Sequence, residues 1–547
     1  MSVSFVINDR PAAAARDMTV FDAAREAGIR VPTSCVTNGK CKECVVEVTA
    51  GAELLSPPTD AERHLTAPFR LSCQARFTGD TGEVRAHTMR RGRMRIERHA
   101  LNLPVTRGDY PHDPAVTRDG AHILIDGTPV ARSSGPIHGL AVDVGTTTVV
   151  LRLVDLESGE IVADASFENP QRFGGSDVMS RIHYDTTHPG KLLRRTLAGY
   201  LAHAIDDLPA DPRTIYEVVI VGNSTMRDLF FRQNVYSIGQ HPYRSISEIE
   251  MTEGRRPSTV LIETGRRCLL PVHPAARVYG APIISGHVGA DAAAAMLAVG
   301  LDGEERLVAV MDIGTNTELI LGNKHRVVAA SCPAGPAFEG GSISAGMPGL
   351  DGAIERVSIA RDGRMTVGVI GGGAPAGICG SGLVALLSEL CRTGQMNVLG
   401  RFDSGDAAIV VDAARGIRFT ESDANELAQA KGANVAGLQV VADHYGITFD
   451  DIDVFYLAGG FGRHLDCDAA KRIGLIPDLP DDKIVQVGNA AIEGATLALV
   501  SVSRRKALES LVTGVEHCRL ETHPRFFDYF VDGCQFRPLQ TSHEVGQ

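Results

Sequence analysis

The same short motif occurs twice in this chain, and a repeat of that size constrains the fold more than any other feature of the sequence. The stretch GLAVDVGTTTVVLRLVD begins at Gly139, and VAVMDIGTNTELILG begins at Val308. Each stretch has an apolar run, then Asp-x-Gly-Thr-x-Thr, then a second run rich in β-branched residues. A repeat on this scale indicates two structural units of the same kind. Two copies in register weaken the simpler interpretation of unrelated β-hairpins with polar turns.

The residue types in the motif suit phosphate and Mg²⁺. Each first run ends near an aspartate, Asp143 or Asp312, whose carboxylate can hold Mg²⁺ directly or through water and position an attacking water. Gly145 and Gly314 let the backbone approach a phosphate, because no Cβ stands in the way. Further donors come from Thr146, Thr147, Thr148, Thr315, Asn316 and Thr317. We expect two facing copies to bind a polyphosphate between two domains. Glu318 is a weaker candidate, since a solvated glutamate on a strand face is the simpler interpretation.

A third stretch, VFYLAGGFGRHLD from Val454, reads as a buried strand followed by Gly459, Gly460 and Gly462. A Gly-Gly step after a strand lets a flat ring lie against the backbone. In order and spacing, the three stretches resemble the phosphate-1, phosphate-2 and adenosine elements of the actin-like ATPase superfamily of sugar kinases, actin and heat-shock chaperones. The resemblance implies ATP as ligand and an α/β fold of two ribonuclease-H-like lobes around a nucleotide cleft.

Near the N-terminus, SCVTNGKCKECVV crowds three cysteines into one polar loop, and a fourth lies in FRLSCQA. The spacing is C-x5-C-x2-C-x28-C, formed by Cys35, Cys41, Cys44 and Cys73. A zinc site usually shows two close pairs of ligands, whereas here the second half is one lone cysteine. The pattern is close to the C-x4-C-x2-C…C of plant-type [2Fe–2S] ferredoxins. The four thiolates are therefore the predicted ligands of a [2Fe–2S] cluster.

The surrounding sequence agrees with a ferredoxin domain. VSFVIND reads as a strand, TVFDAAREAGI as a helix, and CVVEVTAG and GEVRAH as two further strands. This order of elements, with the cysteine loop between the helix and the second strand and a late fourth cysteine, resembles the ferredoxin β-grasp domain. The five-residue gap between the first two cysteines resembles the adrenodoxin branch of that family. The other seven cysteines are scattered singly and are expected to be small buried apolar residues.

Composition excludes several other classes of protein. The net charge of −12 argues against non-specific binding to nucleic acid or an anionic membrane. No apolar run is long enough for a transmembrane helix, and the N-terminus lacks the pattern of a secretory signal. We therefore expect a cytoplasmic protein with reduced thiols that binds neither nucleic acid nor membrane.

These features predict an order of domains along the 547 residues. Residues 1–88 form the [2Fe–2S] domain, 139–306 the first ATPase lobe, and 307–547 the second lobe with a C-terminal segment. Residues 89–138 are basic at first, then rich in Pro and Asp, and read as a linker. Such a linker would let the ferredoxin domain swing between an electron donor and a partner.

Further stretches narrow the resemblance. They are NPQRFGGSDVMSRI from Asn169, VVIVGNSTMRDLFF from Val218, SGHVGADAAAAML from Ser285, SCPAGPAFEGGSISAGM from Ser331, ICGSGLVALLSEL from Ile378 and VGNAAIEGATLAL from Val487. Together with the cysteine loop they resemble the reductive activators of corrinoid proteins over nearly the whole chain.

The resemblance implies an ATP-dependent enzyme that reduces Co(II) to Co(I) in a corrinoid-binding methyltransferase protein. The electron would come from an upstream low-potential donor and pass through the [2Fe–2S] cluster. Two alternatives stay open: an ATP-driven activator of another low-potential metalloenzyme, and a redox-sensing binding module. The sequence also leaves open a homodimer and the identity of the methyltransferase system.

Overall fold

The computed structural model describes residues 3–89, 102–104, 107–460 and 465–539. The chain forms two compact units. The first contains the described residues of 1–93, 112–290 and 498–502, and the second contains those of 94–111, 291–497 and 503–547. Gly462, predicted to contact nucleotide, lies outside the described residues.

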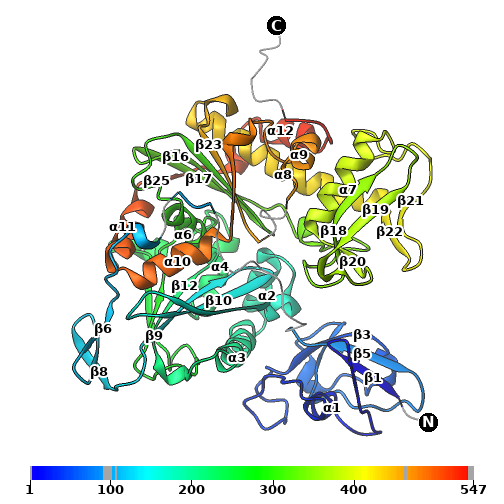
Figure 1. Cartoon of the computed structure of the whole chain (residues 1–547). Coiled ribbons are helices and arrows are strands. Elements are labelled where there is room, and N and C mark those ends of the chain that lie inside the picture. Colours follow the sequence, from blue (N-terminus) through cyan, green and yellow to red (C-terminus); the bar gives the residue numbers. More distant parts are fainter. Residues whose placement is uncertain (1–2, 90–101, 105–106, 461–464, 540–547) are drawn as a thin grey trace. The chain divides into compact units, whose positions relative to one another are not determined.

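The N-terminal domain is a five-stranded sheet with one helix, coloured blue in Figure 1. The strands lie in the order β2 (Arg10–Ala12), β1 (Ser4–Ile7), β5 (Glu83–His87), β3 (Val45–Ala50) and β4 (Phe69–Leu71). Helix α1 (Val20–Glu26) begins after Thr19, whose side chain accepts a hydrogen bond from the Asp22 N–H. The predicted strands and helix are all present, and Val20, Phe21, Ala23 and Ala24 of the helix are buried.

The first lobe is built on a six-stranded sheet. Its order is β11 (Ile161–Glu168), β10 (Thr148–Asp155), β9 (His138–Val144), β12 (Ile215–Val221), β14 (Arg277–Gly280) and β13 (Leu261–Thr264). Strand β9 is antiparallel to β10 and parallel to β12. Every residue of β12 is buried, which is expected of a central strand covered on both faces.

The second lobe repeats this arrangement. Its sheet runs β24 (Ile484–Gly488), β23 (Val454–Ala458), β15 (Val308–Ile313), β16 (Thr317–Asn323), β17 (Arg326–Cys332) and β25 (Val515–His517). Strand β15 is antiparallel to β16 and parallel to β23, as β9 is to β10 and β12. The shared order confirms the predicted duplication and the α/β class.

Helices and two small sheets complete the lobes. The helices are α2 (Val178–Thr187), α3 (Leu192–Asp206), α4 (Ser224–Phe230), α5 (Ile246–Thr252), α6 (Ala290–Ala298), α7 (Gly380–Arg392), α8 (Glu421–Tyr445), α9 (Cys467–Ile473), α10 (Ala490–Val500), α11 (Val502–Thr513) and α12 (Phe526–Gly533). The small sheets of the second unit are β18 (Ala353–Ile359), β19 (Met365–Val369) and β20 (Gly377–Ile378), and β21 (Ala408–Asp412) with β22 (Ile417–Thr420).

Part of the predicted linker is folded. Residues 116–132 form an antiparallel sheet of β6 (Val116–Asp119), β7 (His122–Ile125) and β8 (Thr128–Arg132). Each turn contains an Asp-Gly pair, at Gly120 and Gly127, and both glycines have positive φ. Asp-Gly between short alternating runs is a strong hairpin signal, and the linker prediction missed it.

The ferredoxin domain packs on the first lobe within the first unit. One hydrophobic core cluster contains buried residues of both, from Val3 to Val278. Gly199 of α3 lies so close to the domain that an added Cβ would be 3.1 Å from Pro32. At one edge Arg30 forms ion pairs with Asp206 and Asp207. The swinging motion expected from the sequence would require these contacts to break.

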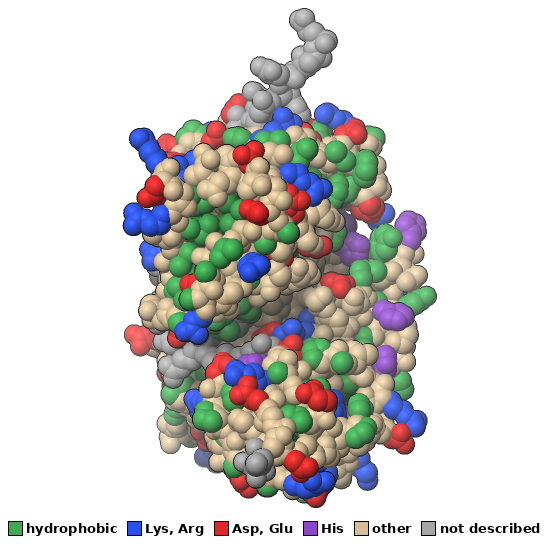
Figure 2. All heavy atoms as spheres, turned by 90° about the vertical axis from the view of Figure 1, so that its right-hand side faces the viewer, with side chains coloured by type: hydrophobic (Ala, Val, Ile, Leu, Met, Phe, Trp, Pro, Cys, Tyr) green, Lys and Arg blue, Asp and Glu red, His purple; other side chains and the backbone are tan. Residues whose placement is uncertain are grey.

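Within the described residues, no helix has both the length and the apolar character needed to cross a bilayer. Acidic and basic side chains are interspersed on the face shown in Figure 2, with no broad area of one sign.

Candidate nucleotide and cluster sites

The first Asp-Gly-Thr motif forms the turn between β9 and β10. Asp143 lies on β9, one residue before its end, and pairs in register with Val150 on one side and Val221 on the other. A Cβ added at Gly145 would lie 2.5 Å from the Thr148 carbonyl oxygen, so the turn requires glycine at this position. Thr146 is buried, and its hydroxyl accepts a hydrogen bond of 2.8 Å from Asn223 Nδ2.

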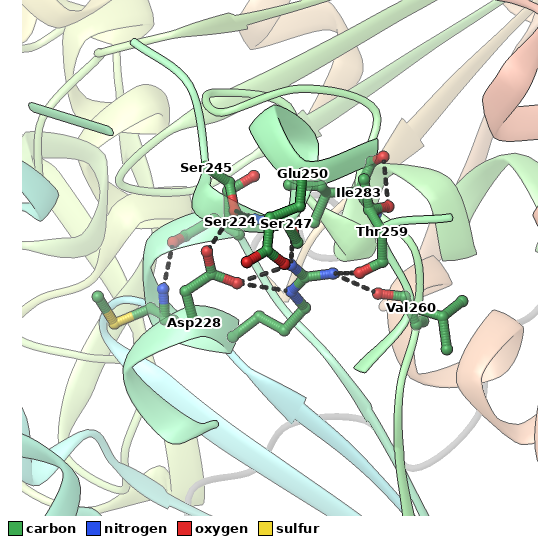
Figure 3. Close-up of polar contacts among 12 residues, drawn as sticks. Ser224, Asp228, Ser245, Ser247, Glu250, Thr259, Val260 and Ile283 are labelled. Atoms are coloured by element: carbon green, nitrogen blue, oxygen red, sulfur yellow. Dashed lines mark hydrogen bonds and ion pairs between the residues drawn. The ribbon is translucent and has the colours of Figure 1, made fainter. Parts of the chain in front are cut away.

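Asn223 is itself positioned by a buried polar network at α4. Its side chain caps α4 by accepting a hydrogen bond from the Met226 N–H. Within α4, Asp228 accepts hydrogen bonds from Arg227 and from Ser245 Oγ, and Figure 3 shows this network. Arg227 also donates to two backbone carbonyls, so the buried charges are fully engaged. The stretch VVIVGNSTMRDLFF thus fixes the loop that contacts the first motif.

The second motif and the Gly-Gly stretch adjoin each other. Asp312 on β15 pairs in register with Ala458, the last residue of β23. A Cβ added at Gly459 would lie 2.6 Å from the Ile313 carbonyl oxygen and 2.8 Å from Asp312 Oδ1. Gly459 also has a φ of +96°. The sheet order therefore brings the third predicted element against the second. That both motifs bind one nucleotide remains a prediction.

Gly459 gives a direct test of this arrangement. We expect Gly459→Ala to weaken binding of Mg²⁺-ATP by about tenfold or more, because the added methyl clashes at the Asp312 carboxylate and the positive φ adds strain of about 1–3 kcal/mol. Calorimetric titration with a non-hydrolysable ATP analogue measures the change. Gly446→Ala is the matched control, since Gly446 also has positive φ but has nothing within 4 Å of an added Cβ. Equal affinity in both variants would contradict the assignment.

The structure corrects the interpretation of Glu318. Its side chain is 6% exposed, where a solvated glutamate was expected. It lies opposite Asp312 in the β15–β16 pair, and Ser331 Oγ donates to its Oε1 at 3.3 Å. Burial, and then the charges of Asp291 and Asp312, raise the pKa of Glu318 well above its ordinary value. The apolar run that follows it, LILG, was the available signal that both faces of β16 are covered.

The remaining threonines of the second motif are also enclosed. Thr315 and Thr317 are buried, and Thr315 Oγ1 donates to the Glu339 carboxylate. Gly314 has more space than Gly145, because an added Cβ would lie 3.2 Å from the Asn316 carbonyl oxygen. The carboxyl groups of Asp312, Asp291 and Glu339 lie around this loop, and carboxylate oxygens suit a cation between protein and phosphate. The residues present therefore fit Mg²⁺.

The four cysteines of the N-terminal domain lie in two hydrogen-bonded pairs. Cys35 contacts Cys41, and Cys44 contacts Cys73. In the described ranges, no group of three or more His, Cys, Asp or Glu side chains is arranged to hold a metal ion. Cys41, Cys44 and Cys73 are buried, whereas Cys35 is half-buried and the neighbouring Val36 is 90% exposed.

Hydrogen bonds favour thiolates at two positions. The hydrogen bond from Cys44 lowers the pKa of Cys73 to about 6, despite burial, and Gln74 Nε2 and the Gly39 N–H add to the effect. Burial opposes ionisation of Cys35, yet backbone N–H groups that include those of Cys41, Asn38 and Lys40 lower its pKa to about 7. Thiolates that accept backbone N–H donors are the ligand set of an iron–sulfur cluster, so these residues fit the group.

Three family models match consecutive parts of the chain. Residues 7–78 match the model of the 2Fe-2S iron-sulfur cluster binding domain, 138–304 match the RACo middle region, and 306–544 match the C-terminal domain of RACo, the ASKHA domain. The "middle region" therefore corresponds to the first lobe.

Relatives match over most of the chain. "Corrinoid activation enzyme RamQ" of Eubacterium limosum is 28% identical over 98% of this chain and 99% of its own. A "[Co(II) methylated amine-specific corrinoid protein] reductase" of Methanosarcina barkeri is 24% identical over 75% of this chain and 79% of its own. The solved structure of a "Reductive activator for corrinoid,iron-sulfur protein" is 26% identical, with a TM-score of 0.72 and coverage of 98% and 99%.

Proposed function

The chain belongs to the RACo family of reductive activators, and on that premise we propose that it is an ATP-dependent corrinoid-protein reductase. It passes one electron from an upstream low-potential donor to the Co(II) corrinoid of a partner methyltransferase protein, which returns to Co(I). ATP is hydrolysed to ADP and phosphate in the same cycle. One observation carries the proposal: a ferredoxin-type loop with clustered cysteines and two Asp-Gly-Thr hairpins in equivalent sheets occur in one chain.

Cys35, Cys41, Cys44 and Cys73 would hold a [2Fe–2S] cluster, which supplies one-electron transfer when bound. The protein's own contribution is the surrounding loop. Backbone N–H groups point at the Cys35 and Cys73 sulfurs and stabilise negative charge there. Cys41, Cys44 and Cys73 are buried, which limits the access of water to their sulfurs.

Asp143 and Asp312 would hold Mg²⁺ and orient the water that attacks the terminal phosphate of ATP. Gly145 and Gly314 keep the backbone N–H groups of their turns accessible to phosphate oxygens. Burial raises the pKa of Glu318 well above its ordinary value, which favours the neutral form of this side chain beside Asp312.

ATP is needed because the electron moves uphill. Each 59 mV of unfavourable potential for one electron costs a factor of ten in the equilibrium constant, or about 1.4 kcal/mol. A nucleotide can offset that only by binding one state of the complex more tightly than another. The ATP-bound protein must therefore favour a state of the partner in which Co(II) is more easily reduced.

The experiment that tests this function is a set of four titrations. Cognate partner in the Co(II) and the methylated form is titrated against the protein, each with and without a non-hydrolysable ATP analogue. We expect the Co(II) form to bind several-fold tighter with the analogue, and by reciprocity to raise the affinity for ATP by the same factor. Identical affinities in all four combinations would contradict ATP-driven activation and favour a redox-sensing role.

A further inference from the structure

The segment Asn169–Gly174, called here the coupling segment, touches the first nucleotide motif at its start. Asn169 is buried, and its Nδ2 donates to the Gly145 carbonyl at 2.8 Å. Its backbone N–H donates to the Thr147 carbonyl at 2.7 Å. Both acceptors belong to the turn predicted to bind phosphate. A shift of that turn on nucleotide binding therefore reaches Asn169 directly.

Three residues further on, the same segment touches the ferredoxin domain. Arg172 Nη1 lies 3.4 Å from Glu47 Oε2, and its guanidinium lies 5.8 Å from the centre of the Phe69 ring. The Phe173 ring packs edge-on against the His64 ring, with 6.5 Å between the two ring centroids. Glu47 stands on β3, which begins directly after the Cys44 position. The 3-10 turn η4 (Pro170–Gly174), capped by the Asn169 side chain, fixes the distance between the two contacts.

Helix α3 provides a second contact with the cysteine loop. A Cβ added at Gly174 would lie 2.6 Å from Leu193 Cδ2, so the coupling segment rests against α3. From α3, Thr196 Oγ1 donates to the Lys42 carbonyl at 3.3 Å and Tyr200 Oη donates to the Val45 carbonyl at 3.0 Å. These two carbonyls lie on either side of Cys44. The nucleotide turn and the cysteine loop are thus joined by packed, hydrogen-bonded residues throughout.

We propose that the coupling segment makes nucleotide binding and the redox state of the ferredoxin domain interdependent. Asn169 binds the phosphate turn, and Arg172 and Phe173 contact the ferredoxin domain at Glu47, Phe69 and His64. This inference rests on the proposed function, because it requires a [2Fe–2S] cluster and ATP. Reduction adds a negative charge to the cysteine loop, and Arg172 is the positively charged residue of the segment, paired with Glu168 and with Glu47 on β3. Movement of Arg172 therefore changes the stability of the reduced state.

Such a coupling must be reciprocal. If ATP raises or lowers the reduction potential, reduction changes the affinity for ATP by the corresponding factor. A tenfold change in affinity corresponds to about 59 mV for one electron. The two quantities are measured independently, and linkage requires them to agree, so each measurement checks the other.

The experiment uses the full chain with its cluster reconstituted. The dissociation constant of a non-hydrolysable ATP analogue with Mg²⁺ is measured in the oxidised and the dithionite-reduced protein, and the midpoint potential is measured by EPR titration with and without the analogue. We expect the two dissociation constants to differ by about tenfold, with a matching shift of about 59 mV. In Arg172→Ala the two dissociation constants should agree to within about twofold. Arg172→Lys should keep part of the difference, because the positive charge remains.

Arg30→Ala is the matched control, because Arg30 joins the ferredoxin domain to α3 at Asp206 and Asp207, outside the coupling segment. This variant should keep the tenfold difference between the dissociation constants of the oxidised and reduced protein. If Arg172→Ala loses its cluster, Phe173→Leu serves as the second variant. If the unaltered protein forms Co(I) but its oxidised and reduced forms have equal dissociation constants for the analogue, this inference alone is overturned. The same holds if both segment variants keep the ratio of dissociation constants seen in the unaltered protein. If the dissociation constants of the oxidised and reduced protein differ as expected but no Co(I) forms, the proposed function is overturned instead.

Discussion

Cys41→Ser abolishes reduction of a Co(II) corrinoid partner and leaves binding of Mg²⁺-ATP within about twofold of the unaltered protein. Serine is a poor ligand for iron compared with thiolate, so the variant should lose the red-brown colour and the two irons and two sulfides expected per chain. Nucleotide binding should survive because Asp143 and Asp312 lie on β9 and β15, in the lobes. Iron analysis, visible spectra and calorimetry measure the three quantities.

The control for this prediction is Cys467→Ser. Cys467 is half-buried at the start of α9 and belongs to the seven cysteines not predicted as ligands. It should keep its iron and its activity. Zinc in place of iron in the purified protein, or full iron content in Cys41→Ser, would contradict the assignment of the ligands.

Asp312→Ala lowers the rate of ATP-dependent activation by at least about 100-fold, or about 2.7 kcal/mol in activation free energy. The carboxylate lies at the end of β15, beside Gly459 and opposite Glu318, where it would hold Mg²⁺ and orient the attacking water. The variant should keep its cluster, because the cysteines belong to the N-terminal domain. Phosphate release and Co(I) absorbance, followed in parallel, measure the loss.

Asp450→Ala provides the comparison, since Asp450 is an exposed carboxylate of the same lobe. It should retain the rate within about twofold. Unchanged activation in Asp312→Ala would remove the assignment of the second Asp-Gly-Thr motif to nucleotide chemistry. A loss of iron in that variant would instead show that the two sites depend on each other for folding.

The duplicated lobes and the ferredoxin domain could be predicted because their signals are local. Close backbone contacts require glycine at positions 145 and 459. A glycine required at a fixed place in a short stretch forms a motif that can be recognised in the sequence. Hydrophobic periodicity located β1, α1, β3 and β5 for the same reason. The sheet at 116–132 was equally local, and its Asp-Gly turns were overlooked because the charged composition around them suggested a linker.

Other features depend on residues far apart in the chain. Glu318 is buried because other elements cover both faces of β16. Those elements lie elsewhere in the chain, so the residue type of Glu318 alone could not indicate its burial. Docking of the ferredoxin domain depends on pairs such as Tyr200 with Val45 and Arg172 with Glu47. Neither partner of such a pair is unusual in its own stretch, so tertiary packing alone identifies them.

The exposure of Val36 beside Cys35 has a kinetic consequence. Cys41, Cys44 and Cys73 are buried, and α3 lies against the backbone at Lys42 and Val45. Val36, at 90% exposure, lies with the exposed residues Ser34, Asn38 and Lys40 on the accessible side of the loop. We expect the electron donor and the corrinoid partner to use this side in turn. Each would then inhibit the other competitively at high concentration, and steady-state rates would follow a ping-pong pattern.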